Sequence, residues 1–267
     1  MNPPWQPGWR PALVGLDVDG TVFDAGQVVG QRLAAAVERA VAAGAHVLPA
    51  TGRSLSTTAP VAAALGVEGW AVCANGAVLA SLDPPQVVEA VTFDPRPVLQ
   101  QLRPDLPGAL FAVEDADGVF RSTRPFRPGA LGVGEAVVTP YEQLLDLAAI
   151  RIVVNSDAHV DTGLGEVAAR FGMHSLLFGI AGTAWLDIGP QGVSKASMLE
   201  RLRRHLGVAA ADTLVIGDGD NDLEMLRWAA VGVAMGHAAA HVQDAADWVT
   251  GETPGDGAAE VLEALFG

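Results

Sequence analysis

Hydrophobic residues in this chain fall into short runs that alternate with longer Ala- and Leu-rich stretches. Short apolar runs are typical of strands buried on both faces, and the longer stretches are typical of helices. Their alternation predicts a mainly parallel sheet with helices on both faces. In the first part of the chain, the predicted strands are 12–17, 45–49 and 70–74, and the predicted helices are 31–43 and 55–65. In the last part, the predicted strands are 185–188, 213–217, 231–234 and 247–249, and the predicted helices are 194–206, 221–228, 238–243 and 257–266.

The composition changes between these two parts. From Asp83-Pro84-Pro85 to about Ala184 the chain carries many prolines and several arginines, with strand-like runs at 110–113 and 150–154. We therefore predict an α/β protein with a doubly wound, mainly parallel, Rossmann-like core. The core would be formed by residues 1–82 and 185–267, and residues 83–184 would form an inserted α+β domain.

Composition and charge limit the classes of partner. The chain has 267 residues, half of them hydrophobic, and a net charge of −15. This charge argues against nucleic acid and anionic membrane surfaces, which attract stripes of Lys and Arg. A single cysteine, Cys73, excludes an internal disulfide, and the N-terminal segment lacks the features of a signal peptide. We expect a cytoplasmic protein with no membrane partner, in which any anionic substrate needs a local cation.

Two carboxylates follow the first predicted strand, in the run Leu16-Asp17-Val18-Asp19-Gly20-Thr21. In an open α/β sheet, ligands bind at the carboxyl ends of the strands. A chain that turns at Gly20 can direct Asp17 and Asp19 at one small volume from different sides. Two acids so close together need a cation, a shared proton or separate roles.

Three further polar segments follow predicted strands or begin predicted helices. Thr51-Gly52-Arg53 offers a hydroxyl and backbone N–H groups before a helix, which suits phosphate oxygens. Gly192-Val193-Ser194-Lys195 begins another helix, and the run 217–222 places three carboxylates and an amide in one turn. Thr51 or Asn221 alone could be an ordinary N-cap. Four such segments at strand and helix ends predict one site.

Lys195 is the only lysine in the chain, and the other 15 of the 16 basic residues are Arg. A site that requires a compact ammonium instead of a planar guanidinium is the simplest explanation. The alternative is a solvated lysine that happens to begin a helix.

The four segments, in this order, resemble the four motifs of the haloacid dehalogenase superfamily of phosphohydrolases. The turn Ala74-Asn75-Gly76-Ala77, Met235-Gly236 and Asp256-Gly257 are similar to its Cof-like branch. Members of that branch insert a C2-type cap between the second and third motifs, where this chain changes composition. His237 is a departure, because such proteins usually carry Asn after Met-Gly.

The resemblance implies a Mg²⁺-dependent phosphatase that acts on small phosphorylated metabolites such as sugar phosphates. Asp17 would form an aspartyl-phosphate, Asp19 would act as acid and then as base, and Lys195 would neutralise charge. The implied Mg²⁺ ligands are Asp17, Asp19 through its backbone carbonyl, and Asp218, with Asp222 supporting them from further out. The implied substrate-binding residues are Thr51, Gly52, Arg53 and Asn221.

Two alternatives stay open at this point. Asp19 argues against a dehalogenase, because a halide leaving group needs no proton. It leaves open a phosphosugar mutase or phosphotransferase, in which an alkoxide also needs a proton. A non-catalytic protein that binds Mg²⁺ or phosphate would be favoured by the loss of a catalytic group, but all are present. Substrate recognition is expected from residues 83–184, where Arg121, Arg124 and Arg127 could bind a second anionic group or simply form a solvated surface.

Overall fold

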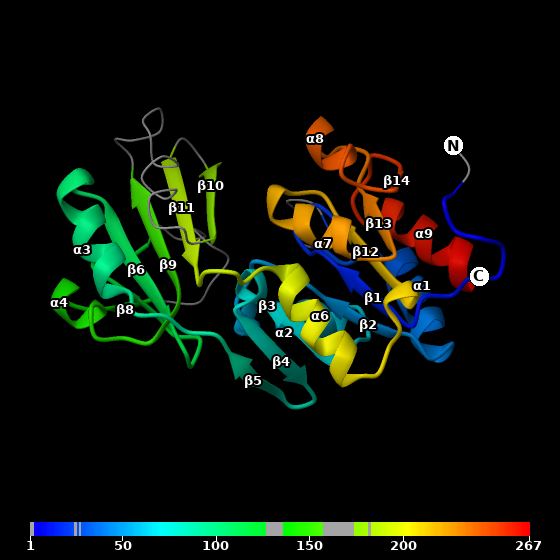
Figure 1. Cartoon of the computed structure of the whole chain (residues 1–267), viewed down its shortest axis with the longest axis horizontal. Helices are drawn as coiled ribbons and strands as arrows, with labels where there is room; N and C mark the ends of the chain where they lie inside the picture. The colour runs from blue at the N-terminus through cyan, green and yellow to red at the C-terminus, as the bar shows by residue number, and fades with distance from the viewer. Residues whose placement is uncertain (1–2, 24–25, 27, 127–135, 157–173, 181–182) are drawn as a thin grey trace. The chain divides into compact units, whose positions relative to one another are not determined.

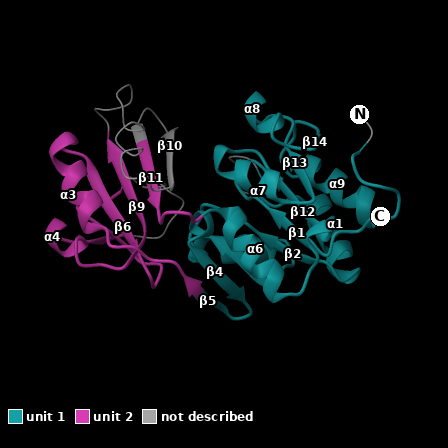
Figure 2. Cartoon of the chain, viewed as in Figure 1, with its two compact units in different colours: residues 1–88, 194–267 teal, residues 89–193 magenta. Residues whose placement is uncertain are grey.

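Two units make up the chain, and one is formed from both ends of the sequence. The computed structural model describes residues 3–23, 26, 28–126, 136–156, 174–180 and 183–267. The first unit comprises residues 1–88 and 194–267, and the second comprises residues 89–193 (Figure 2). No helix among the described residues is long and apolar enough to cross a bilayer.

The main sheet of the first unit has five parallel strands in the order β14-β13-β12-β1-β2. These strands are β1 (Leu13–Leu16), β2 (His46–Pro49), β12 (Thr213–Gly217), β13 (Val231–Ala234) and β14 (Trp248–Val249). All four residues of β1 are buried, as expected for a central strand covered on both faces. The parallel core predicted from the alternating pattern is confirmed.

The helices of this unit lie on the two faces of the sheet (Figure 1). They are α1 (Gln31–Ala42), α2 (Leu55–Ala64), α6 (Lys195–His205), α7 (Leu223–Trp228), α8 (Ala240–Gln243) and α9 (Asp256–Phe266). Helix α1 buries Leu33, Ala36, Val37 and Ala40, which recur at helical spacing and form one apolar stripe. Helix α1 packs against α9, and α6 packs against α7.

The order of the strands determines where a ligand can bind. Helix α1 leads from β1 to β2, whereas α7 leads from β12 to β13 in the opposite direction across the sheet. Since such connections are right-handed, α1 and α7 lie on opposite faces. The carboxyl ends of β1 and β12 therefore border the crevice in which ligands of doubly wound sheets bind.

A second, three-stranded sheet in the order β3-β4-β5 continues from the main one. Its strands are β3 (Trp70–Cys73), β4 (Val78–Leu82) and β5 (Pro85–Ala90). The strand predicted at 70–74 is present and contacts the main sheet through a parallel bridge between Ala50 and Val72. It also pairs antiparallel with β4, which the sequence analysis did not predict, because the turn η1 (Ala74–Gly76) reverses the chain after only three residues.

The second unit contains a six-stranded sheet in the order β10-β11-β9-β6-β7-β8. Its strands are β6 (Leu110–Asp115), β7 (Phe120–Ser122), β8 (Val137–Val138), β9 (Ala149–Ser156), β10 (His174–Ile180) and β11 (Thr183–Gly189). Helices α3 (Arg96–Asp105) and α4 (Tyr141–Leu144) pack on one face, where Leu99, Leu102 and Leu144 meet residues of β6 and β9.

The strand predicted at 185–188 was assigned to the wrong sheet. It lies within β11, which pairs antiparallel with β9 and β10 in the second unit. Trp185, Leu186 and Ile188 are buried there. A short buried run has the same pattern in either sheet, so hydrophobicity alone did not distinguish them.

Candidate active site

Lys195 joins two carboxylates at the carboxyl ends of β1 and β12. Its Nζ donates to Asp17 Oδ1 and to Asp222 Oδ1, both at 2.6 Å. The side chains of Lys195 and Asp222 have no exposed surface, and that of Asp17 is 6% exposed. Although burial alone would lower the pKa of Lys195, Asp17 and Asp222 raise it above its ordinary value of 10.5. Lys195 is therefore a buried cation at neutral pH, not a solvated lysine.

Local structure determines where α6 begins and so where Lys195 lies. Ser194 precedes the helix, and its hydroxyl accepts the N–H of Ser197 at 3.3 Å. The hydroxyl of Ser197 in turn accepts the N–H of Ser194 at 2.9 Å. This capping box satisfies backbone groups at the start of the helix and makes Lys195 its first residue.

The turn after β12 is organised by the carboxylate of Asp222. Its Oδ2 accepts the N–H groups of Asp218 and Gly219, both at 2.9 Å, while Oδ1 accepts Lys195. A Cβ at Gly217 would lie 2.5 Å from the Asp222 carboxyl carbon, so this carboxylate can approach only a glycine. Gly20, which has a φ of +91°, likewise allows the carboxylate of Asp218 to approach the backbone, since a Cβ there would lie 2.1 Å from Asp218 Oδ2.

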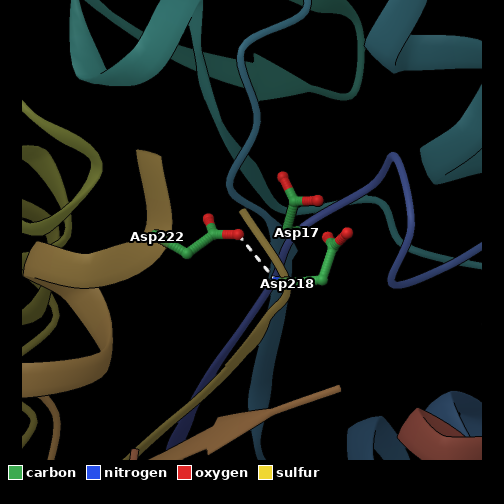
Figure 3. A group of neighbouring side chains, drawn as sticks. All are labelled: Asp17, Asp218 and Asp222. Carbon is green, nitrogen blue, oxygen red and sulfur yellow. Dashed lines mark hydrogen bonds between the residues drawn. The ribbon is translucent and has the colours of Figure 1, made fainter. Parts of the chain in front are cut away.

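Three carboxylates converge at this point (Figure 3). Asp17, Asp218 and Asp222 each bring an oxygen within 4.8 Å of the others. Burial and the nearby charges of Asp222 and Asp218 raise the pKa of Asp17 well above its usual range, although Lys195 opposes this. Burial and Asp222 also raise the pKa of Asp218, against hydrogen bonds from His237 and Thr21. With all three carboxylates ionised, they and the one ammonium leave two net negative charges, and hard oxygen ligands with this charge fit a divalent cation such as Mg²⁺.

Asp19 lies apart from the three converging carboxylates. Among the described residues it pairs with Arg53, whose Nε donates to Oδ2 at 2.7 Å and whose Nη2 donates to Oδ1 at 2.5 Å. The guanidinium is itself held 5.0 Å over the ring of Phe23. The side chain of Asp19 is 59% exposed, whereas that of Arg53 is 12% exposed. Arg53, predicted to bind substrate, thus contacts the predicted acid and base.

The loop after β2 presents backbone and hydroxyl groups at the same edge of the sheet. Thr51 is buried, and its Oγ1 accepts the N–H of Arg53 at 3.1 Å. Because the oxygen accepts this bond, the hydroxyl proton of Thr51 is left to donate to another acceptor.

Asn221 and His237 complete the contacts. Asn221 Nδ2 donates to Asn75 Oδ1 at 3.0 Å. The ring of His237 lies between the Glu252 carbonyl, 3.0 Å from Nδ1, and Asp218 Oδ2, 3.3 Å from Nε2. His237 is the residue that departs from the Cof-like pattern, and its contact with Asp218 could not be inferred from sequence.

Some residues at this edge were not identified as functional from sequence. Thr21 is fully buried and its Oγ1 donates to Asp218 Oδ1 at 3.2 Å. The family resemblance points to Asn75 only as part of a turn, although an Asn-Gly pair after a strand is itself a signal for positive φ. Of the three arginines predicted at 121–127, Arg121 donates to Asp115 at 2.9 Å, Arg124 is exposed, and Arg127 lies outside the described residues.

The profile of the haloacid dehalogenase-like hydrolase family matches residues 14–103 and 141–262. The chain therefore belongs to this family, and the resemblance to its Cof-like branch is confirmed. The phosphoglycolate phosphatase of Methanothermobacter thermautotrophicus is 26% identical over 95% of this chain and 98% of its own length. The 5-amino-6-(5-phospho-D-ribitylamino)uracil phosphatase YcsE of Bacillus subtilis is 24% identical over 94% of each chain.

A solved structure supports the fold. BT1666, a phosphatase from Bacteroides thetaiotaomicron, superposes with a TM-score of 0.80 at 24% identity, over 96% of this chain and 95% of the other. The predicted Rossmann-like α/β fold is confirmed. The family and the names of the relatives confirm the predicted enzyme class, a phosphoric monoester hydrolase.

Proposed function

We propose that this enzyme is a Mg²⁺-dependent phosphatase that hydrolyses small phosphorylated metabolites through an aspartyl-phosphate on Asp17. The observation that carries the proposal is the position of Asp17 at the end of β1. There its buried carboxylate is held by Lys195 beside Asp218. A carboxylate in this setting is an oriented nucleophile, and the adjacent ammonium offsets the charge of an incoming phosphate.

In the first step, an oxygen of Asp17 attacks phosphorus as the bond from phosphorus to the ester oxygen breaks. Asp19, in its protonated form, gives its proton to the departing alkoxide, and the alcohol leaves. Lys195 stays hydrogen-bonded to the cluster, where its charge stabilises the extra negative charge of the transition state.

In the second step, the carboxylate of Asp19 takes a proton from water, and the water oxygen attacks phosphorus. The bond to Asp17 breaks, which releases inorganic phosphate and restores the Asp17 carboxylate. Asp19 suits both steps because its side chain is exposed and can meet both the leaving group and water.

Thr51, Gly52 and Asn221 are proposed to hold the phosphoryl group. The hydroxyl proton of Thr51 and the backbone N–H after it are donors that match phosphoryl oxygens. Arg53, by contrast, acts on the reaction through the carboxylate of Asp19.

Mg²⁺ would be held by Asp17, Asp218 and the backbone carbonyl of Asp19. Bound there, it would stabilise charge on a phosphoryl oxygen. Asp222 supports these ligands from further out, because its two oxygens already accept Lys195 and two backbone N–H groups.

The support for a substrate class comes from the relatives. The names of two relatives each specify a phosphate ester of a small organic molecule. We propose a substrate of the same kind, with recognition of its alcohol part by the inserted segment predicted at 83–184.

The test is phosphate release from a panel of sugar phosphates and other small esters, with and without Mg²⁺. The expected result is Mg²⁺-dependent release that Asp17→Asn lacks by several orders of magnitude. In Asp19→Asn, 4-nitrophenyl phosphate should give a burst of one equivalent of nitrophenolate and a protein heavier by one phosphoryl group.

Two results would count against the proposal. If Asp17→Asn keeps a tenth of the activity, Asp17 is not the nucleophile. If phosphate passes to an added sugar faster than to water, the enzyme is a transferase or mutase instead.

A further inference from the structure

The turn between β3 and β4 has a backbone conformation found nowhere else in the described chain. Ala74 has a φ of 49° and Asn75 a φ of 53°, and they are the only non-glycine residues with positive φ among those described. Gly76 follows with a φ of 98°. L-residues avoid this region, and such strain persists where the surrounding structure imposes it, often at functional sites. The turn contacts three segments of the first unit.

The first contacts are with the loop that carries Thr51. The N–H of Asn75 donates to the Thr51 carbonyl at 3.0 Å, and the N–H of Ala74 donates to the Arg53 carbonyl at 2.8 Å. Between these bonds, a Cβ on Gly52 would lie 3.0 Å from Asn75 Oδ1. The turn and the Thr51 loop are thus in contact along their backbones.

The second contact is with the turn after β12. Asn75 Oδ1 accepts Asn221 Nδ2 at 3.0 Å, although the two residues are 146 positions apart. The left-handed backbone of Asn75 permits this, because the same residue donates its N–H to Thr51 and directs its side chain to Asn221.

The third contact is with the start of α6. A Cβ on Gly76 would lie 2.1 Å from the Ser194 carbonyl oxygen and 3.0 Å from the backbone nitrogen of Lys195. Only glycine allows the turn to approach the helix this closely.

We propose that Asn75 is a positioning residue for the phosphate-binding groups of Thr51 and Asn221, and that Gly76 sets the position of Lys195. The inference rests on the proposed function, because it takes the Thr51 loop as the phosphate site. Asn75 acts through these two partners and does not itself react.

The first experiment uses Asn75→Gly, which keeps the backbone free to adopt positive φ and removes only the amide. Binding of inorganic phosphate in the presence of Mg²⁺, measured by calorimetry, should weaken about tenfold, as for the loss of an oriented hydrogen bond. The KM for an ester should rise by the same factor, while kcat changes less than about threefold. Asn221→Ala should weaken phosphate binding similarly. The double variant should bind phosphate no more weakly than whichever single variant has the lower affinity, because both substitutions remove the same contact.

The second experiment compares Gly76→Ala with Gly66→Ala. Both glycines have positive φ, but a Cβ at Gly66 meets nothing within 4 Å. Gly66→Ala therefore reports the backbone strain alone, and only Gly76→Ala should lower kcat, by about a hundredfold.

The inference is overturned if Asn75→Gly lowers only thermal stability and leaves phosphate affinity and KM unchanged. Additive effects of Asn75→Gly and Asn221→Ala would also contradict it. Calorimetry does not depend on turnover, so an enzyme that binds phosphate normally but hydrolyses no ester would refute the proposed function and leave this inference standing.

Discussion

Replacing Lys195 by Met tests the charge balance of the site most directly. Methionine keeps most of the apolar length of the side chain and removes the ammonium that lies 2.6 Å from Asp17 and from Asp222. Both carboxylates are buried, and Asp218 lies nearby. The substitution therefore removes the one positive charge from a cluster of three carboxylates, two of which are buried.

The expected cost is about 3 to 5 kcal/mol of unfolding free energy, the range for removing one partner of a buried ion pair. That is a fifth or more of the total stability of a typical domain, which is about 5 to 15 kcal/mol. Urea unfolding at pH 7 should show a lower midpoint with an unchanged slope. Arg201→Met is the matched control, because this arginine is exposed on the same helix and should change stability by less than about 0.5 kcal/mol.

The pH dependence has a definite sign. The folded-state pKa of Lys195 is raised, so its contribution is fully present below the ordinary lysine pKa of 10.5 and is lost only as the pH rises through the raised value. Titration of Lys195 itself should therefore leave the difference in stability between wild type and Lys195→Met unchanged from pH 7 to pH 9. That difference should shrink in acid, where protonation of the carboxylates removes the uncompensated charge.

Activity is expected to respond differently from stability. Lys195→Arg keeps the charge but has a broader planar head, so activity should fall about 10²- to 10³-fold, nearly as far as in Lys195→Ala. Arg at this position with a tenth or more of wild-type activity would refute the requirement for a compact ammonium. A loss below about 1 kcal/mol in Lys195→Met would refute the charge argument.

Three further predictions concern Arg53, Glu200 and the accessibility of Lys195. Arg53→Ala should slow the first step, in which the alcohol leaves, about 10- to 100-fold for alkyl phosphates but less than about 3-fold for 4-nitrophenyl phosphate, whose leaving group needs no proton from Asp19; equal losses in single-turnover measurements would contradict this. The hydrogen bond from Arg203, with others from neighbouring donors, lowers the pKa of Glu200 from 4.5 to about 2, so its stabilisation is present above pH 4.5 and is lost as the pH falls toward 2. The urea midpoints of wild type and Glu200→Gln should converge over that pH window. A constant difference between the midpoints would contradict the lowered pKa of Glu200. An amine-acylating reagent should modify only the α-amino group of the folded protein, and Lys195 should react only after unfolding. Labelling of Lys195 in the native protein would show that it is accessible.

Much of the first unit could be predicted because its signals are local. Strand β13 and helices α1 and α9 were predicted to within a residue or two, since a buried strand or amphipathic helix leaves its period in consecutive residues. The ends of strands could be located for the same reason, and Asp17 and Asp218 were placed at the correct edge of the sheet.

The pairing of strands could not be predicted in the same way. The runs at 70–73 and 185–188 are buried strands, but each pairs antiparallel in a sheet that the pattern did not indicate. Burial gives the same apolar pattern whichever neighbour a strand has, whereas pairing depends on turns and on segments distant in the chain.

By itself, the sequence determined the class of fold, the polar segments at the strand ends and the presence of a unique lysine. Only the tertiary structure decided that Lys195 is wholly buried between Asp17 and Asp222, and that Arg53 contacts Asp19. Lys195 and Asp17 are 178 residues apart, and Asn75 and Asn221 are 146 apart. The physical reason is that strand and helix patterns arise from neighbouring residues, whereas ion pairs and shared hydrogen bonds depend on how strands distant in sequence are ordered in the sheet.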